Sequence, residues 1–241
     1  MTGAVAGVMR QVPLDFEPDR SWRLDTFAAA HNPEWPHLRE VLLQPCAQQP
    51  VYLWGPTGSG KTHLLQAAQA EAQANGVRVA GFDLRSPLPW QPWQSWQPGE
   101  PGEVGLLVLD DCDRFDAGRQ HAAFVLFVEA MARGVPVLAA GALPPVDLPI
   151  RDDLRSRLGW GLVFRLSPPG EDDVRRLLRC EADRRGMFLS DDVMDFLLRR
   201  LARDLGHLMA VLDRLDRYAL AAQRSVTVPL LRQMLAEEVG A

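Results

Sequence analysis

Residues 55–62 combine glycines, a lysine and a threonine in the spacing of a phosphate-binding loop. Their sequence, GPTGSGKT, satisfies the pattern G-x-x-x-x-G-K-[ST] and lies between an apolar run and a segment that can form a helix. Glycines let the backbone curl so that its N–H groups face phosphate oxygens, and the start of the helix adds positive charge. Lys61 can then reach the β- and γ-phosphates, and the Thr62 hydroxyl can bind magnesium. The alternative is an ordinary glycine-rich turn.

The use of lysine in this chain supports the same interpretation. Lys61 is the only lysine in the chain, and all the other residues in the total of 26 lysines and arginines are arginines. A compact ammonium fits a phosphate loop in which a planar guanidinium would not. The loop therefore predicts binding of a purine nucleoside triphosphate or diphosphate with magnesium.

Two adjacent carboxylates form a second candidate group. Residues 106–111 read LLVLDD, an apolar strand that ends in Asp110 and Asp111. P-loop enzymes place such an acid beside the magnesium ion, and we expect Asp110 to take that position. Asp111 could orient or activate the attacking water, although it is one methylene shorter than the glutamate common in strong ATPases. Two solvated acids at the end of a strand are the alternative.

Five short apolar runs supply the elements that would position these groups. They are suited to buried parallel strands separated by helices, as in an α/β domain. The runs are residues 51–54, 77–82, 105–109, 135–140 and 161–166.

The chain changes character after Pro168 and Pro169, where apolar residues recur at spacings of three and four. This period is typical of amphipathic helices. Ser190 and Thr227 precede such periods and can cap helices, so we expect three or four helices there. The predicted organisation is an extended tail over residues 1–21, an α/β domain over 22–167 and a small all-helical domain over 168–241.

Residues 87–102 form a loop in which Trp90, Trp93 and Trp96 alternate with proline and glutamine. Proline makes a helix unfavourable there. One interpretation is an aromatic contact surface for a partner. The favoured one is a loop whose tryptophans fold back over the sheet, because indole rings usually find cover.

Bulk properties exclude several classes of protein. The 241 residues are 47% hydrophobic and 24% charged, which is ordinary for a globular chain, and the net charge of −5 argues against a basic nucleic-acid surface. Cys46, Cys112 and Cys180 suggest neither a disulfide framework nor a zinc site, and we expect reduced core residues. No leader and no stretch of about 18 apolar residues is evident, so we expect a cytoplasmic protein without a membrane partner.

The phosphate loop, the acidic strand and the run RDDLRSRL at residues 151–158 together resemble the bacterial replication initiator DnaA family within the AAA+ ATPases. The resemblance covers roughly residues 22–241. It implies an AAA+ P-loop domain with a parallel five-stranded sheet, followed by a helical lid. It also implies that residues 24–27 pack on adenine and that Arg157 is an arginine finger acting in trans. The alternative for Arg157 is a solvated charge in an arginine-rich segment.

The resemblance and the motifs together define the predicted site residues. The nucleotide-binding residues are Gly55, Pro56, Thr57, Gly58, Ser59, Gly60, Lys61, Thr62 and Phe27. The magnesium ligands are Thr62 and Asp110, and the catalytic groups are Arg157 and Asp111.

Within this family the chain is most similar to the Hda group, the DnaA-related regulatory inactivators. The hexapeptide QVPLDF at residues 11–16 resembles the sliding-clamp binding motif of that group. Gln11, Leu14, Asp15 and Phe16 would anchor the tail, with Gln11 hydrogen-bonded and the apolar side chains buried in the clamp's pocket. The alternative is a tail that packs on its own domain.

Two positions depart from the AAA+ pattern. Ala142 falls where a polar sensor residue usually lies beside the γ-phosphate, and Gly206 falls where a second sensor is an arginine, although Arg203 one turn earlier could substitute. Missing γ-phosphate contacts reduce transition-state stabilisation more than diphosphate binding. We therefore expect an ADP-bound switch with weak intrinsic hydrolysis.

The resemblance implies a negative regulator of replication initiation that binds the β sliding clamp and promotes ATP hydrolysis by DnaA. DNA contact would be indirect, because no helix-turn-helix domain follows the lid. A homodimer and a monomer both remain open. The alternatives are an AAA+ helicase loader, which clamp binding would distinguish, and a P-loop small-molecule kinase, which would phosphorylate a soluble acceptor.

Overall fold

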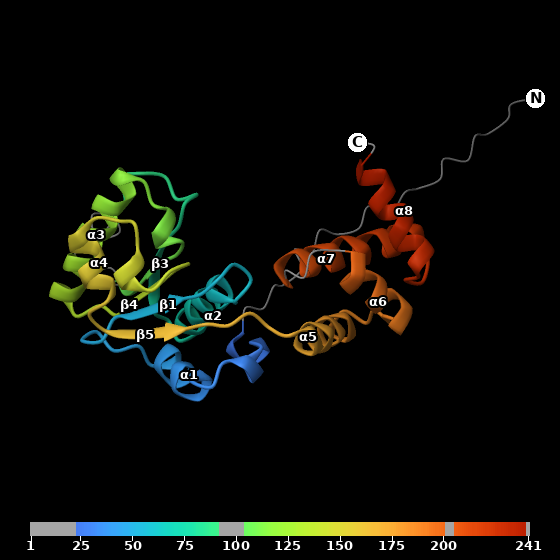
Figure 1. Cartoon of the computed structure of the whole chain (residues 1–241), viewed down its shortest axis with the longest axis horizontal. Helices are drawn as coiled ribbons and strands as arrows, with labels where there is room; N and C mark the ends of the chain where they lie inside the picture. Colours follow the sequence, from blue (N-terminus) through green and yellow to red (C-terminus); the bar gives the residue numbers. More distant parts are fainter. Residues whose placement is uncertain (1–22, 92–103, 201–204, 240–241) are drawn as a thin grey trace, which may run out of the picture.

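A computed structural model of the chain describes residues 23–91, 104–200 and 205–239. An α/β domain and a helical domain lie side by side, joined by the segment that leaves the last strand (Figure 1). The tail predicted to bind the clamp lies outside the described residues, as do Trp93, Trp96 and Arg203.

The α/β domain contains one parallel sheet of five strands in the order β2-β3-β4-β1-β5. The strands are β1 (Val51–Trp54), β2 (Arg78–Phe82), β3 (Val104–Leu109), β4 (Val137–Gly141) and β5 (Leu162–Arg165). Each lies within or beside one of the five apolar runs, because a parallel strand covered on both faces needs apolar residues almost throughout. The predicted five-stranded α/β fold is confirmed.

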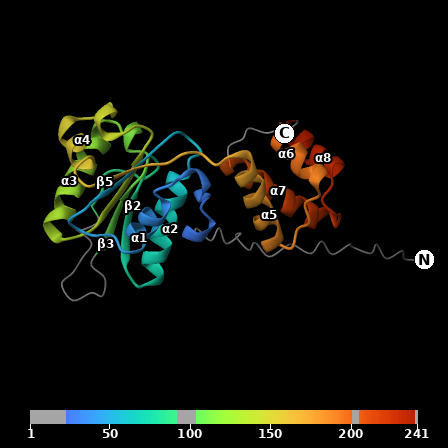
Figure 2. The same ribbon diagram turned by 60° about the horizontal axis from the view of Figure 1, so that its bottom comes forward.

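Helices cover both faces of the sheet (Figure 2). They are α1 (Trp35–Leu43), α2 (Lys61–Ala74), α3 (Ala117–Arg133) and α4 (Asp152–Leu158). Alternate residues of a strand point to opposite faces, so Val51 and Leu53 of β1 pack with α1 and α2, while Tyr52 packs with α3 and α4. Four short 3-10 helices lie between these elements: η1 (Leu24–Thr26), η2 (Ala29–His31), η3 (Cys112–Arg114) and η4 (Pro145–Asp147).

The strand order brings the functional segments to one edge of the sheet. Strand β4 lies between β3 and β1, with Leu109 opposite Ala139 and Trp54 opposite Gly141. All strands run in the same direction, so the segments that follow β1, β3 and β4 emerge next to one another. Ligands of open α/β sheets bind at this carboxyl edge.

The second domain consists of four helices among its described residues: α5 (Glu171–Arg184), α6 (Asp191–Arg200), α7 (Leu205–Ala222) and α8 (Val228–Val239). Its core contains the apolar residues that gave the helical period, among them Val174, Leu178, Val193, Leu197, Leu208, Leu212 and Leu215. The Ser190 and Thr227 hydroxyls accept hydrogen bonds from the third residue after each of them. Both predicted caps are confirmed.

The domains are linked through the segment between η2 and α1. The buried Asn32 side chain accepts a hydrogen bond from the N–H of Ser167 at 2.8 Å and donates one to its carbonyl at 3.3 Å. His31 Nδ1 lies 3.0 Å from the carboxylate of Asp173, a buried residue in the first turn of α5. The linker that enters the helical domain is therefore fastened to the segment that precedes the sheet.

The expectation for the cysteines was wrong at two positions. Cys112 is buried, but Cys46 and Cys180 are exposed, and all three are free thiols. A lone cysteine gives no periodic signal, so its burial does not follow from sequence. Within the described ranges, no helix is long and apolar enough to cross a membrane.

Candidate nucleotide site

The loop between β1 and α2 has a shape that its glycines make possible. Gly58 and Gly60 have φ angles of 81° and 90°, in the left-handed region that other residues rarely adopt. A Cβ atom on Gly60 would lie 2.8 Å from Cε2 of Phe27, and one on Gly55 would lie 2.2 Å from the carbonyl oxygen of Leu166. The loop is thus closely packed between these two residues.

Lys61 begins α2 with its ammonium folded over the loop. Its Nζ donates hydrogen bonds to the carbonyls of Gly55 at 2.8 Å and Pro56 at 3.0 Å, and the residue is only 9% exposed. Burial lowers the pKa of Lys61, while the negative charges of Asp110 and Asp111 oppose this shift. The loop therefore concentrates a desolvated positive charge at the carboxyl edge of the sheet.

Ser59 provides an independent indication that the loop accommodates a polar ligand. The residue is 1% exposed, and its hydroxyl oxygen has no hydrogen-bond partner among the described residues. A buried hydroxyl without a partner is costly in a folded protein. The glycine-shaped backbone, the ammonium and this hydroxyl together fit a bound polyphosphate.

Thr62 and Asp110 meet as the sequence predicted for magnesium ligands. The Thr62 hydroxyl donates to Oδ2 of Asp110 at 2.7 Å. Burial raises the pKa of Asp110, the hydrogen bond from Thr62 lowers it, and the neighbouring Asp111 raises it further. Among the described residues, no group of three or more His, Cys, Asp and Glu side chains could hold a metal. Magnesium usually combines few protein oxygens with phosphates and water, so this pair suits nucleotide-bound magnesium.

Asp111 adopts a different environment from its neighbour. Its φ angle of 55° is left-handed, a conformation that aspartate tolerates better than most residues. Its carboxylate lies 3.8 Å from a guanidinium nitrogen of Arg114, and its N–H donates to Asp110 at 2.9 Å. The structure places Asp111 beside the magnesium-side acid, and its role in orienting water stays a prediction.

The end of β4 is fixed by two residues that sequence reasoning missed. The N–H of Ala142 donates to Oδ1 of Asp113 at 2.9 Å, and the Tyr52 hydroxyl donates to the carbonyl of Leu143 at 2.9 Å. Tyr52 is buried, which raises its pKa. A Cβ on Gly141 would lie 2.2 Å from the Tyr52 hydroxyl. Backbone groups are thus well held here, while Ala142 presents only a methyl group.

The segment before the sheet brings Phe27 to the loop. The ring of Phe27 packs against Trp35 with centroids 4.6 Å apart, and it lies close to Gly60, where an added Cβ atom would be 2.8 Å from its Cε2 atom. His63, next to the magnesium-side Thr62, lies 3.0 Å from the carbonyl of Arg23 and 3.3 Å from the Thr26 hydroxyl. These contacts hold η1 against α2. Phe27 is therefore positioned beside the phosphate loop, and its contact with a purine stays a prediction.

Arg157 lies on α4, which covers the face of the sheet opposite to α2 (Figure 1). The two other arginines of its segment are paired with carboxylates: Arg151 with Asp153 and Arg155 with Asp152, each at 2.6 Å. Arg151 also lies over the ring of Phe124, and Arg157 lies over the ring of Trp160, each with its Cζ atom 5.3 Å from the ring centroid. Arg157 has no carboxylate partner among the residues that the structure describes.

The helical domain gives the most specific comparison. Residues 171–235 match the family model of the Hda lid domain. The chain superposes on domain III of the replication initiation protein DnaA from Thermotoga maritima with a TM-score of 0.69 and 20% identity, covering 91% of this chain and 97% of that one. The helical domain is therefore similar to the lid domain of Hda, and the chain as a whole shares the fold of DnaA domain III.

Two further structures share the fold with this Hda-like chain. One is the replication initiator DnaA bound to AMPPCP and single-stranded DNA, with a TM-score of 0.61 and 20% identity; the match covers 81% of this chain and 64% of that one. The other is the RuvB Holliday junction branch migration motor of Thermotoga maritima, with a TM-score of 0.56 and 14% identity over 83% and 65% of the two chains. These similarities confirm the AAA+ fold.

The lid of the Hda-like chain offers no side chain at one predicted sensor position. Gly206 lies in the first turn of α7 and is exposed. Arg203, the predicted substitute, lies outside the described residues. The lid instead contacts the α/β domain through His31 and Asp173, a pair 142 residues apart that no sequence motif announces.

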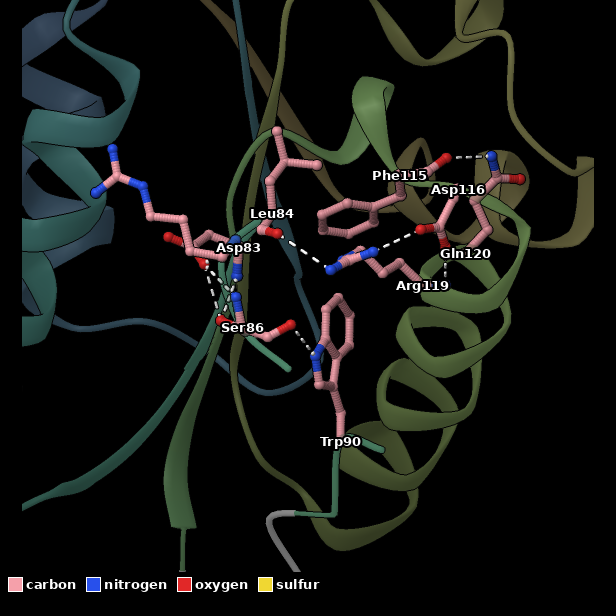
Figure 3. A network of polar contacts seen from close by, with 9 residues as sticks. Asp83, Leu84, Ser86, Trp90, Phe115, Asp116, Arg119 and Gln120 are labelled. Carbon is pink, nitrogen blue, oxygen red and sulfur yellow. Dashed lines mark hydrogen bonds and ion pairs between the residues drawn. The ribbon is translucent and has the colours of Figure 1, made fainter. Parts of the chain in front are cut away.

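The tryptophan loop begins as the favoured interpretation predicted. Trp90 is 6% exposed, stacks on Phe82 with centroids 4.9 Å apart and meets Phe115 edge-on at 5.3 Å. Figure 3 shows its indole nitrogen donating to the carbonyl of Ser86, at 3.3 Å. The first tryptophan of the loop therefore belongs to the core, as predicted.

Proposed function

We propose that this Hda-like chain binds an adenine nucleotide with magnesium at the loop of residues 55–62. The backbone N–H groups of the loop and Lys61 would hold the phosphates, Thr62 and Asp110 would bind magnesium, and Phe27 would cover the purine. The ion would neutralise phosphate charge. Support comes from the desolvated ammonium, the unpartnered Ser59 hydroxyl and the Thr62–Asp110 contact.

The same site favours a bound diphosphate over rapid hydrolysis. Ala142 offers a methyl group and Gly206 a hydrogen atom where AAA+ sensor side chains would contact the γ-phosphate. Preorganised donors at the transferred group supply much of the rate enhancement of phosphoryl transfer. The proposed resting state is therefore ADP-bound, with slow intrinsic turnover.

The proposed role is to promote ATP hydrolysis by DnaA and so to prevent repeated initiation. The observation that carries it is the position of Arg157: it lies on the opposite face of the sheet from α2, with no carboxylate partner among the described residues. A guanidinium whose charge is not compensated by a carboxylate can stabilise negative charge at a phosphate held by another protein. In GTPase systems such an arginine is worth about 10³ to 10⁵ in rate. The match to the Hda lid supports DnaA as the partner.

The tail would direct this activity to replicating DNA. In this proposal Gln11, Leu14 and Phe16 anchor the chain to the β sliding clamp, and contact with DNA is made through the clamp and DnaA. Tethering raises the effective concentration of Arg157 near clamp-loaded DNA.

ATP hydrolysis by DnaA, measured with the chain and clamp on DNA, tests the arginine role. Arg157→Ala is expected to remove stimulation by about a thousandfold while leaving nucleotide binding to the chain unchanged. Arg151→Ala is the matched control, because that guanidinium is already paired with Asp153. Equal loss in both variants would reject Arg157 as the acting group.

Clamp binding tests the tail separately. Replacing Gln11, Leu14 and Phe16 by alanine is expected to abolish binding to purified clamp, while the phosphate loop still binds nucleotide. Absence of binding even in the unchanged chain would favour a helicase loader instead.

A further inference from the structure

A turn at the end of α4 places an aromatic ring under the guanidinium of Arg157. The N–H of Trp160 donates to the carbonyl of Arg157 at 3.2 Å, which closes the turn through Gly159. The Cζ atom of Arg157 then lies 5.3 Å from the centroid of the Trp160 ring. This distance is within the range of a cation–π interaction.

Apolar packing in the α/β domain holds the turn in place. Leu154 and Leu158 are buried in the α/β core. A Cβ atom on Gly159 would lie 3.2 Å from Cβ of Pro145 in η4, so the turn and η4 are in close contact. The backbone that carries Trp160 is therefore anchored, although 63% of the residue is exposed.

An aromatic partner holds an arginine without neutralising it. The carboxylates beside Arg151 and Arg155 compensate the charge and use the N–H donors of those residues. A ring face attracts the guanidinium through its quadrupole and leaves the N–H groups at the edge free to bind a planar oxyanion. The ring of Trp160 thus restricts the motion of the Arg157 guanidinium without neutralising its charge.

We propose that Trp160 is a positioning residue for Arg157. Its ring restricts the guanidinium to an orientation from which it reaches a phosphate bound by the partner, so that less side-chain entropy is lost in the transition state. This inference rests on the proposed function, and it assigns to Trp160 an effect on the rate of the partner's hydrolysis rather than on binding to the partner.

The experiment compares Trp160→Ala and Trp160→Phe for two quantities: the maximal rate of ATP hydrolysis by DnaA at saturating chain, and the affinity of the chain for DnaA loaded with AMPPCP. Trp160→Ala is expected to lower the maximal rate about two- to fivefold, the factor typical of a cation–π contact at an exposed site. Its affinity for DnaA stays within about twofold of the unchanged chain, as does ADP binding at its own loop. Trp160→Phe retains a ring and restores most of the rate.

Other outcomes separate this inference from the proposed function. An unchanged maximal rate in Trp160→Ala, with Arg157→Ala still inactive, would overturn the positioning role alone. Weaker binding at an unchanged maximal rate would also overturn it, because Trp160 would then be a contact residue. Full stimulation by Arg157→Ala would reject the proposed function and this inference together.

Discussion

Two cations of the α/β domain occupy opposite environments. Lys61 is almost fully buried, and its ammonium is held by the carbonyls of its own loop beside two aspartates. Arg157 is half-buried, lies over Trp160 and has no carboxylate partner among the described residues. The first cation is placed to serve a ligand of this chain, whereas the second is suited to a ligand that another protein brings.

This difference agrees with the proposed function, in which one AAA+ domain retains a nucleotide and acts on another. A loop that holds a diphosphate needs desolvated donors, and β1 and α2 provide them. In the proposed function, an arginine that acts in trans needs an uncompensated charge, and Arg157 on α4 is half-buried without a carboxylate partner among the described residues. The two cations should therefore respond independently to mutation.

The largest expected effect is the loss of ADP affinity when Lys61 is replaced. Lys61→Ala removes the ammonium that would make charge-assisted hydrogen bonds to phosphate oxygens, each worth about 1.5–3 kcal/mol. We expect about a thousandfold weaker binding of magnesium ADP, measured by isothermal titration calorimetry.

Arg157→Ala is the matched control for this experiment, and its ADP affinity should stay within about twofold of the unchanged chain. Parallel losses in both variants would mean that the two cations serve a single site. The division between them would then be wrong.

A third cation sharpens the comparison, because it is held by carboxylates. Arg185, the residue after α5, lies 2.5 Å from Asp213 and 2.6 Å from Glu181, and all three side chains are largely buried. Arg185→Met would remove the ion pairs of Arg185 with Asp213 and Glu181, although Glu181 would keep its pair with Arg184, and should cost about 3 kcal/mol of lid stability. Hydrogen exchange of amides in α5 and α7 measures this loss.

Arg157→Ala is the control variant for Arg185→Met, and the ion pairs of Glu181 predict how lid stability depends on pH. Arg157→Ala should change stability by about 1 kcal/mol or less, since Arg157 pairs with no described acid and loses only its contact with the Trp160 ring. Burial raises the pKa of Glu181, but hydrogen bonds from Arg184 and Arg185 lower it more. The stability from Glu181 is therefore present above its unfolded pKa of about 4.3 and is lost as the pH falls through the lowered value. An Arg185→Met variant equally destabilised at all pH values would contradict this account.

The sequence predicted the elements of this molecule better than their long-range contacts. Residues 55–62 and Asp110 follow local rules of spacing, so the sequence could predict that the loop and the acid meet, and the structure places Thr62 against Asp110. The contacts of Tyr52 with Leu143 and of His31 with Asp173 depend on strand order and domain packing, which no local pattern encodes. The partner of Arg157 could not be predicted either, because a cation–π contact depends on how the chain turns at Gly159.

A smaller effect on ADP affinity is expected when Phe27, which is proposed to cover the purine, is replaced. Phe27 packs against Trp35 and lies close to Gly60, and aromatic stacking on a base is worth about 1–3 kcal/mol. Phe27→Ala should weaken ADP binding about tenfold and leave binding of inorganic pyrophosphate unchanged. Equal losses for both ligands, in calorimetric titrations, would show that Phe27 shapes the loop instead of contacting the base.

The smallest effect is expected at Ala142, where the sequence predicts that a polar sensor side chain is absent. Ala142 follows β4, between the strands that lead to the phosphate loop and to Asp110, and its backbone is fixed by Asp113. Ala142→Asn would add a polar group near the γ-phosphate without disturbing that backbone bond. We expect a severalfold rise in the chain's own ATP hydrolysis, well below the factor of about 10² to 10³ that an optimised donor supplies. Single-turnover hydrolysis measures it, and Ala142→Val, which adds similar bulk without polarity, should show no rise. An equal rise in both variants would attribute hydrolysis to loop movement and would contradict the proposal that the absent polar side chain limits turnover.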